Sequence, residues 1–288
     1  MMKKGKRKYV EYNYEATYIE DIDHATDSKI EELLKQGKIK SVYTTKTIKA
    51  GKQFEVEIYP SFTKKQITGA GVKKNNYQAQ KNLNDKNARK KLERLIHANF
   101  KENDLYLTFT YDNKHLPASI EEAKKKMKNY IDRINYRRKK LGMGNAKYIY
   151  ITEYSDKRKI RCHHHLIMDG AMGMDDAEKV WKCGRTSASR IKPDEDGTLT
   201  ALASYLSKDP AGSKRWCSSL NLKKPYESKS YTAFRACHVK KMVEARHRAK
   251  EMLEKKYRNK KLIFEEIRYN EVNDYVYIYA KMSERCNQ

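Results

Sequence analysis

A run of three histidines that continues into an apolar segment constrains this chain more than any other feature. Residues 162–168 read Cys-His-His-His-Leu-Ile-Met, a pattern typical of a strand. Side chains alternate between the two faces of a strand, so His163 and His165 point to one face while His164 points to the other. Two neutral imidazoles that converge on one spot can supply half of a metal site. The segment therefore predicts a sheet that carries a pair of metal ligands on one face.

The charge of the chain indicates what such a site would act on. The sequence has 63 Lys and Arg against 37 Asp and Glu, a formal net charge of +26. A surplus of this size favours binding to phosphate backbones, with an anionic membrane surface as the alternative. No apolar run of about 18 residues, secretion signal or lipidation motif occurs, so we expect a cytoplasmic protein that does not enter a membrane. Five cysteines without a C-x-x-C pair are consistent with reduced thiols.

Strands and helices alternate in the middle of the chain. The periodicities predict, in order, strand 105–111, helix 119–141, strand 147–154, strand 163–168, helix 175–182 and helix 198–208. Short connections between such elements favour an α+β fold, in which an antiparallel-rich central sheet carries the histidine motif and helices pack on it. The flanking elements predicted are a short helix at 28–36, a hairpin at 42–59, a basic helix at 75–99, one long basic helix at 233–260 and strands at 262–269 and 275–282.

A carboxylate precedes the histidine strand at a position that can complete the metal site. Glu153 ends the strand before the turn, and a hairpin would return it beside His163 and His165. Two imidazoles and a carboxylate leave coordination positions open for water or a substrate oxygen, which a catalytic metal site requires. Two alternatives stay open. The histidines and Glu153 can form a polar surface patch without a metal, or a zinc ion can bind Cys162 or Cys183 together with a histidine.

A second candidate element is the segment 202–208, which reads Leu-Ala-Ser-Tyr-Leu-Ser-Lys and is expected on a helix. Tyr205 and Lys208 are three residues apart and therefore project from neighbouring positions of one helix face. The unperturbed pKa of tyrosine is about 10, so a nucleophilic tyrosine needs a nearby cation to lower the cost of the phenolate. Such a pair also occurs for packing and solvation alone. Its interest comes from the intervening sheet, which can bring it close to the histidines.

Three motifs of this chain together resemble the HUH endonucleases, which are named for a His-hydrophobic-His strand. Within that superfamily the chain is similar to the rolling-circle replication initiators of Gram-positive bacteria, phages and mobile elements. The motifs are the strand 105–111, the histidine strand with Glu153 upstream, and the helix that contains Tyr205. Segments 46–51, 84–88 and 221–225 are also similar to this group, so that the resemblance extends over about 46–225.

The chain departs from the family pattern at three positions. His164 stands where the family usually has a hydrophobic or aromatic residue, and Cys162 stands where proline is common. Some relatives carry a second tyrosine one turn before the first, where this chain has Ala201. The resemblance is therefore to the single-tyrosine enzymes.

The resemblance implies an RRM/ferredoxin-like HUH fold and a nicking and joining reaction on single-stranded DNA at a replication origin. It implies that His163, His165 and Glu153 hold a divalent ion, Mg²⁺ or Mn²⁺. Tyr205 would attack the scissile phosphate and form a 5′-phosphotyrosine link with release of a 3′-OH, while Lys208 would stabilise negative charge.

The same resemblance sets expectations for partners and domains. The DNA partner would be single-stranded or supercoiled origin DNA in a bacterial host. Because no G-x-x-x-x-G-K-[ST] motif occurs, a host helicase and polymerase would be needed. The oligomeric state is not predicted. A relaxase or single-tyrosine transposase with the same chemistry, and a nucleic-acid-binding protein without activity, are the alternatives. The expected parts are an N-terminal extension at 1–40, a catalytic domain with its hairpin and helix at 41–235, and a basic helix with a strand pair at 236–288.

Overall fold

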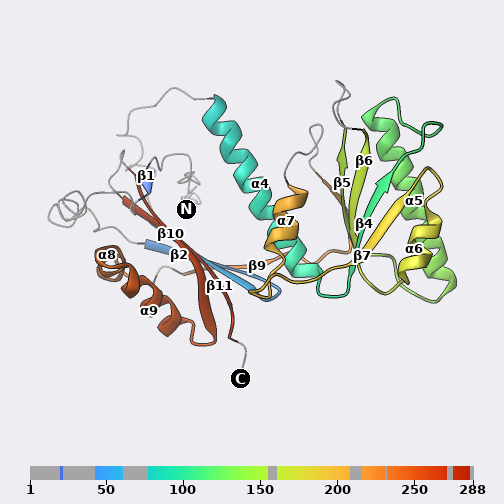
Figure 1. Cartoon of the computed structure of the whole chain (residues 1–288). Helices are drawn as coiled ribbons and strands as arrows, with labels where there is room; N and C mark the ends of the chain where they lie inside the picture. Colours follow the sequence, from blue (N-terminus) through green and yellow to red (C-terminus); the bar gives the residue numbers. More distant parts are fainter. Residues whose placement is uncertain are drawn as a thin grey trace, which may run out of the picture. The chain divides into compact units, whose positions relative to one another are not determined.

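A computed structural model describes residues 20–21, 43–60, 77–154, 161–207, 216–230, 232–270 and 275–285. The chain divides into two compact units, Arg89–Pro225 and the combination of Met1–Ala88 with Tyr226–Gln288. Each unit contains one antiparallel sheet with helices packed on it (Figure 1). The predicted α+β class is confirmed. No helix among the described residues is both long and apolar enough to span a bilayer.

The unit Arg89–Pro225 is built on a five-stranded sheet in the order β7-β4-β6-β5-β8. Its strands are β4 (Leu105–Thr110), β5 (Tyr148–Glu153), β6 (His163–Met168), β7 (Thr186–Arg190) and β8 (Cys217–Ser218). All neighbouring strands are antiparallel, and the histidine strand β6 lies between β4 and β5. This position brings residues of both neighbours beside the histidines.

Helices cover both faces of this sheet (Figure 1). Helices α5 (Ile120–Lys140) and α6 (Met174–Val180) share a core with the face that carries Leu166 and Met168. Helix α7 (Thr200–Leu206) and the C-terminal part of α4 (Tyr77–Asn99) share a core with the opposite face, which carries Ile167. Because side chains alternate along β6, the face under α7 is the face of His163 and His165.

Helix α5 illustrates why the sequence folds locally as predicted. Ser119 caps its first turn by accepting a hydrogen bond from the Glu122 backbone N–H at 3.2 Å, and the Glu122 carboxylate accepts one from the Ala118 N–H at 2.8 Å. Such reciprocal capping satisfies N–H groups that a helix start leaves unpaired. Its buried residues then repeat at helical spacing: Ala123, Met127, Tyr130, Ile131, Ile134 and Arg138.

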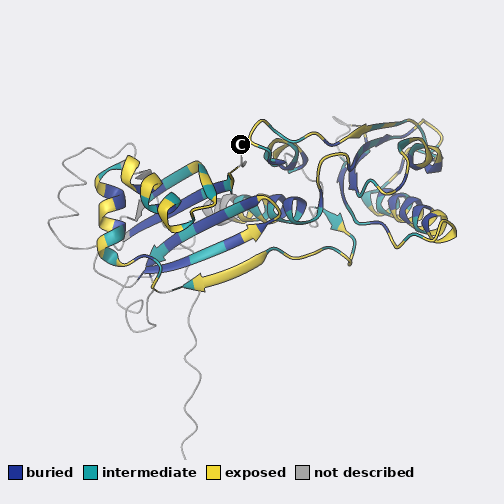
Figure 2. Cartoon of the chain, turned by 90° about the horizontal axis from the view of Figure 1, so that it is seen from below, coloured by how far each residue is buried: buried dark blue, intermediate teal, exposed yellow. Residues whose placement is uncertain are grey.

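The second unit contains a six-stranded antiparallel sheet in the order β1-β10-β11-β3-β2-β9. The strands are β1 (Glu20–Asp21), β2 (Tyr43–Ala50), β3 (Gln53–Pro60), β9 (Tyr226–Ser230), β10 (Lys260–Asn270) and β11 (Tyr275–Glu284). Helices α8 (Ala236–Glu244) and α9 (Arg246–Lys256) pack on one face of this sheet through a shared apolar core. In Figure 2 their exposed residues lie on the side away from the strands.

The prediction of one continuous helix at 233–260 is wrong. The backbone of Ala245 is extended, with φ −156° and ψ 123°, and separates α8 from α9. The break has a packing reason, because both helices bury apolar residues against the same sheet: Val239, Met242 and Val243 from α8, and Ala249 and Leu253 from α9. A single straight helix would carry one of these groups away from the sheet.

Strands β7, β8 and β9 were missed because their sequences are polar. They lie at sheet edges and show mostly exposed or half-buried residues, so no apolar alternation marks them. The predicted hairpin is present as β2 and β3. It pairs with β9 and β11 and thus joins the C-terminal strands, whereas the sequence grouped it with the histidine sheet. The helix predicted at 28–36 lies outside the described residues.

Candidate active site

The structure brings together the three residues predicted as metal ligands. Glu153 is the cross-strand partner of His163, and His165 lies two residues further along β6 on the same face. The Nε2 atom of His163 is 3.2 Å from one Glu153 carboxylate oxygen, and the Nε2 atom of His165 is 3.3 Å from the other. The candidate ligand atoms of all three residues lie within 4.8 Å of one another. This spacing allows one cation to contact all three.

Hydrogen bonds to the other ring nitrogens orient both imidazoles. The Nδ1 atom of His163 is 2.9 Å from the Arg161 carbonyl oxygen, which can only accept, so this nitrogen carries the proton. The Nδ1 atom of His165 is 2.7 Å from the Tyr106 hydroxyl and 3.3 Å from the Thr108 hydroxyl. Such bonds commonly fix the tautomer of a metal-binding histidine and leave Nε2 free to act as ligand.

The His165 Nε2 atom supports a metal at this position. It is buried and has no hydrogen-bond partner within the described part of the chain. Burial, with a smaller contribution from His163, lowers the pKa of His165 to about 4, so its ring is neutral at physiological pH. With the proton on Nδ1, the Nε2 lone pair faces a carboxylate oxygen of Glu153. Two acceptors at 3.3 Å repel each other unless a cation lies between them. The residues present therefore fit a divalent ion.

His164 lies on the opposite face, as the strand alternation predicts, and both its ring nitrogens have partners. Nε2 is 2.7 Å from the Tyr111 hydroxyl, and Nδ1 is 2.9 Å from the Thr152 hydroxyl. The ring is fully buried, and burial lowers its pKa to about 3. Among the described residues, no metal-binding group includes Cys162 or Cys183, so the alternative zinc site has no support.

Tyr205 lies on the same face as the candidate metal ligands. Its ring centroid is 5.4 Å from that of His165, in an edge-on arrangement. Helix α7 is held by buried Ala203 and Leu206 and by the Thr200 hydroxyl, which donates to Glu93 of α4 at 2.8 Å. The tyrosine itself is 52% exposed, so a DNA strand can reach it. Lys208, the second predicted catalytic residue, lies outside the described residues.

Tyr106 is a residue of the site that the sequence reasoning missed. Its hydroxyl bonds to His165, its ring stacks nearly parallel to the His165 ring, and it also hydrogen-bonds to the Tyr205 side chain. Burial raises its pKa to about 12, and the neighbouring Tyr205 and Glu153 add to the rise. The available signal was the alternation in β4, where residues 106, 108 and 110 are polar or amphipathic between apolar neighbours.

A central His-His strand, a carboxylate on the adjacent strand and a tyrosine helix over the same face together define a protein of the HUH type. Residues 104–210 match the family described as replication-associated protein ORF2, a rolling-circle replication initiator family. This match confirms the predicted resemblance and identifies a replication-associated protein. It covers a little over a third of the chain and includes all residues of the site. No curated protein and no solved structure matches the chain.

Proposed function

We propose that this protein initiates rolling-circle replication by nicking and rejoining single-stranded DNA at an origin through a 5′-phosphotyrosine intermediate. The observation that carries the proposal is the position of Tyr205, whose half-exposed ring lies 5.4 Å from the His165 ring beside the candidate metal ligands. The family match adds a replication context. The proposed catalytic part is Arg89–Pro225, which falls within the predicted domain 41–235.

The proposed metal ligands are His163, His165 and Glu153, and the proposed ion is Mg²⁺ or Mn²⁺. When bound, the ion would act as a Lewis acid that polarises a phosphate oxygen of the scissile bond. The protein contributes the orientation of the ligands. Arg161 and Tyr106 hold the two imidazoles with their Nε2 atoms toward Glu153.

Tyr205 is the proposed nucleophile. Its hydroxyl oxygen attacks phosphorus and forms a P–O bond, the phenolic proton is lost, and the bond to the 3′ oxygen breaks as that oxygen leaves with a proton. The phosphodiester energy is retained in the phosphotyrosine, so attack by a 3′-OH can later rejoin the strand. Tyr106 orients the Tyr205 hydroxyl through their hydrogen bond. Lys208 is proposed to stabilise the developing negative charge.

The product explains the replication role. A free 3′-OH is a primer for a host polymerase, and a host helicase would supply the unwinding because the sequence has no ATP-binding P-loop motif. The net charge of +26 supports binding to origin DNA.

The test uses single-stranded oligonucleotides and supercoiled plasmid that carry a cognate origin, incubated with full-length protein and Mn²⁺. We expect nicked product and a protein covalently attached to the 5′ end. Tyr205→Phe should abolish both and retain DNA binding. Tyr136→Phe, which removes a hydroxyl from an exposed tyrosine of α5, is the matched control and should leave cleavage unchanged. Nicking by Tyr205→Phe at the wild-type rate would refute the assignment of the nucleophile.

A further inference from the structure

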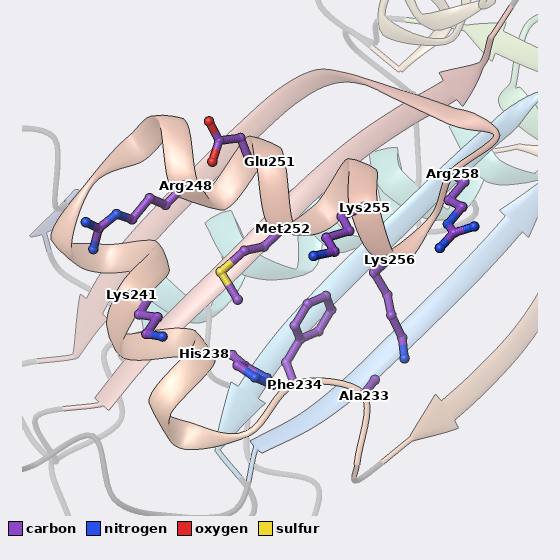
Figure 3. A pocket seen from close by; sticks show the side chains of 10 residues that line it. All are labelled: Ala233, Phe234, His238, Lys241, Arg248, Glu251, Met252, Lys255, Lys256 and Arg258. Carbon is purple, nitrogen blue, oxygen red and sulfur yellow. The ribbon is translucent and has the colours of Figure 1, made fainter.

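A pocket of about 770 Å³ lies in the unit that contains α8 and α9, outside the segment that matches the replication family. Its wall is formed by residues of both helices and by residues immediately before α8 and after α9 (Figure 3). A pocket of this size is in the range of about 300–1,000 Å³ that small-molecule sites occupy. It is therefore large enough to enclose one nucleotide.

The wall is strongly basic. Lys241, Lys255, Lys256 and Arg258 are exposed, and no carboxylate of the described residues forms an ion pair with any of them. Another cation of the wall, Arg248, is paired with a glutamate on the preceding helix at 3.0 Å. The four cations without such a partner create a positive potential that attracts phosphate.

Apolar side chains lie between these cations. Phe234 is 3% exposed and belongs to the core under the helices, while Met252 is half-buried. In this view the lysine side chains of α8 and α9 surround the Phe234 ring (Figure 3). A cationic rim above an apolar floor is complementary to a nucleotide, because its phosphates seek charge and its base seeks apolar or aromatic surface.

We propose that this α8–α9 pocket holds one unpaired nucleotide of the single-stranded DNA on which the nicking site acts. Its phosphates would contact Lys241, Lys255 and Lys256, and its base would lie over Phe234 and Met252. A duplex is a poorer occupant, since its bases are stacked inside and only its phosphates could reach the rim. The proposal rests on the proposed function and adds a binding contact that performs no chemistry.

The test compares two double variants of the full chain that carry the same charge change on the same helices. Lys241→Gln with Lys255→Gln removes two cations of the pocket. Lys240→Gln with Lys250→Gln removes two exposed cations that do not line it. Binding of a labelled single-stranded oligonucleotide is measured by fluorescence anisotropy in EDTA, across a series of salt concentrations, after thermal unfolding has verified that each variant is folded.

The pocket variant should bind single-stranded DNA roughly tenfold more weakly near 0.15 M salt, and the slope of log affinity against log salt should become shallower by about 1.4. The control variant should stay within about twofold of the wild type. Equal weakening by both variants would mean that only overall charge matters and would overturn the proposal. So would an equal or greater loss of affinity for a duplex of the same sequence.

Nicking separates this proposal from the function on which it rests. At saturating DNA the pocket variant should nick origin DNA at the wild-type rate. A wild-type protein that does not nick would overturn the proposed function, whereas a difference in affinity between the two variants would still support a nucleotide site in the pocket.

Discussion

The two faces of the five-stranded sheet use the same residue types in opposite ways. On the α5 face, His164 is fully buried and both of its ring nitrogens are hydrogen-bonded. On the α7 face, His163 and His165 present their Nε2 atoms to a shared carboxylate, and the buried Nε2 of His165 has no hydrogen-bond partner among the described residues. Adjacent histidines of one strand thus differ because their neighbours differ. One face satisfies its polar atoms for stability, and the other leaves them available for a ligand.

The largest expected effect follows from removing the available nitrogens. Replacing His163 and His165 by Ala should lower the rate of Mn²⁺-dependent nicking by on the order of 10³-fold, because the proposed metal contact to the phosphate is lost. Single-strand binding in EDTA should change by less than about twofold, since phosphate binding depends on the many cations elsewhere.

Cleavage assays and anisotropy on the same preparations check this expectation. Nicking that persists in the double variant would place the metal site elsewhere. A parallel loss of DNA affinity would instead indicate that these residues bind the strand, and the distinction between the two faces would then be drawn wrongly.

A smaller effect is expected for the hydroxyl that orients His165. Tyr106→Phe keeps the ring that stacks on His165 and removes its hydrogen bonds to His165 and Tyr205. Loss of a partner that orients a metal ligand typically costs about 10–100-fold in metal affinity or activity. Mn²⁺ titration by calorimetry and nicking rates at saturating Mn²⁺ separate the two contributions.

If Tyr106 acts through His165, high Mn²⁺ should restore most of the rate. If it orients Tyr205, the rate should stay low at every metal concentration. Unchanged metal affinity together with an unchanged rate would remove Tyr106 from the site. Tyr136→Phe again serves as control, because Tyr136 is exposed on α5.

The contrast between the faces was predictable from the sequence to the extent that it depends on neighbouring residues. Strand alternation alone separates His163 and His165 from His164, and a tight connection alone returns Glu153 to them. Tyr106 could not be assigned in this way. Its contact with His165 depends on the register between β4 and β6, strands that are more than fifty residues apart in the sequence.

The second sheet shows the same limit. The pairing of the hairpin β2–β3 with β11 joins distant segments, and the polar edge strand β9 carries no apolar alternation that could announce it. The break at Ala245 was also hidden, because alanine is a good helix former and only the packing of α8 and α9 on one sheet requires an extended residue there.

The smallest effect on catalysis is expected on the α5 face, where stability should change instead. His164→Leu keeps an apolar group of similar size but leaves the Tyr111 and Thr152 hydroxyls without their partner in the core. We expect the free energy of unfolding to fall by about 3 kcal/mol, since a buried unpaired polar group costs about 1–3 kcal/mol. His163→Leu, at a half-buried position, should cost less than about 1 kcal/mol.

Urea denaturation in EDTA measures stability without any contribution from a bound ion, and calorimetric Mn²⁺ titration of the folded variants measures the site. His164→Leu should lose stability and retain Mn²⁺ affinity within about threefold, while His163→Leu should retain stability and lose Mn²⁺ affinity by on the order of 10²-fold. The opposite outcomes would be decisive. Since the two residues are adjacent on β6, equal losses in both variants for either quantity would mean that the faces are coupled through the strand and do not divide stability from ligand binding.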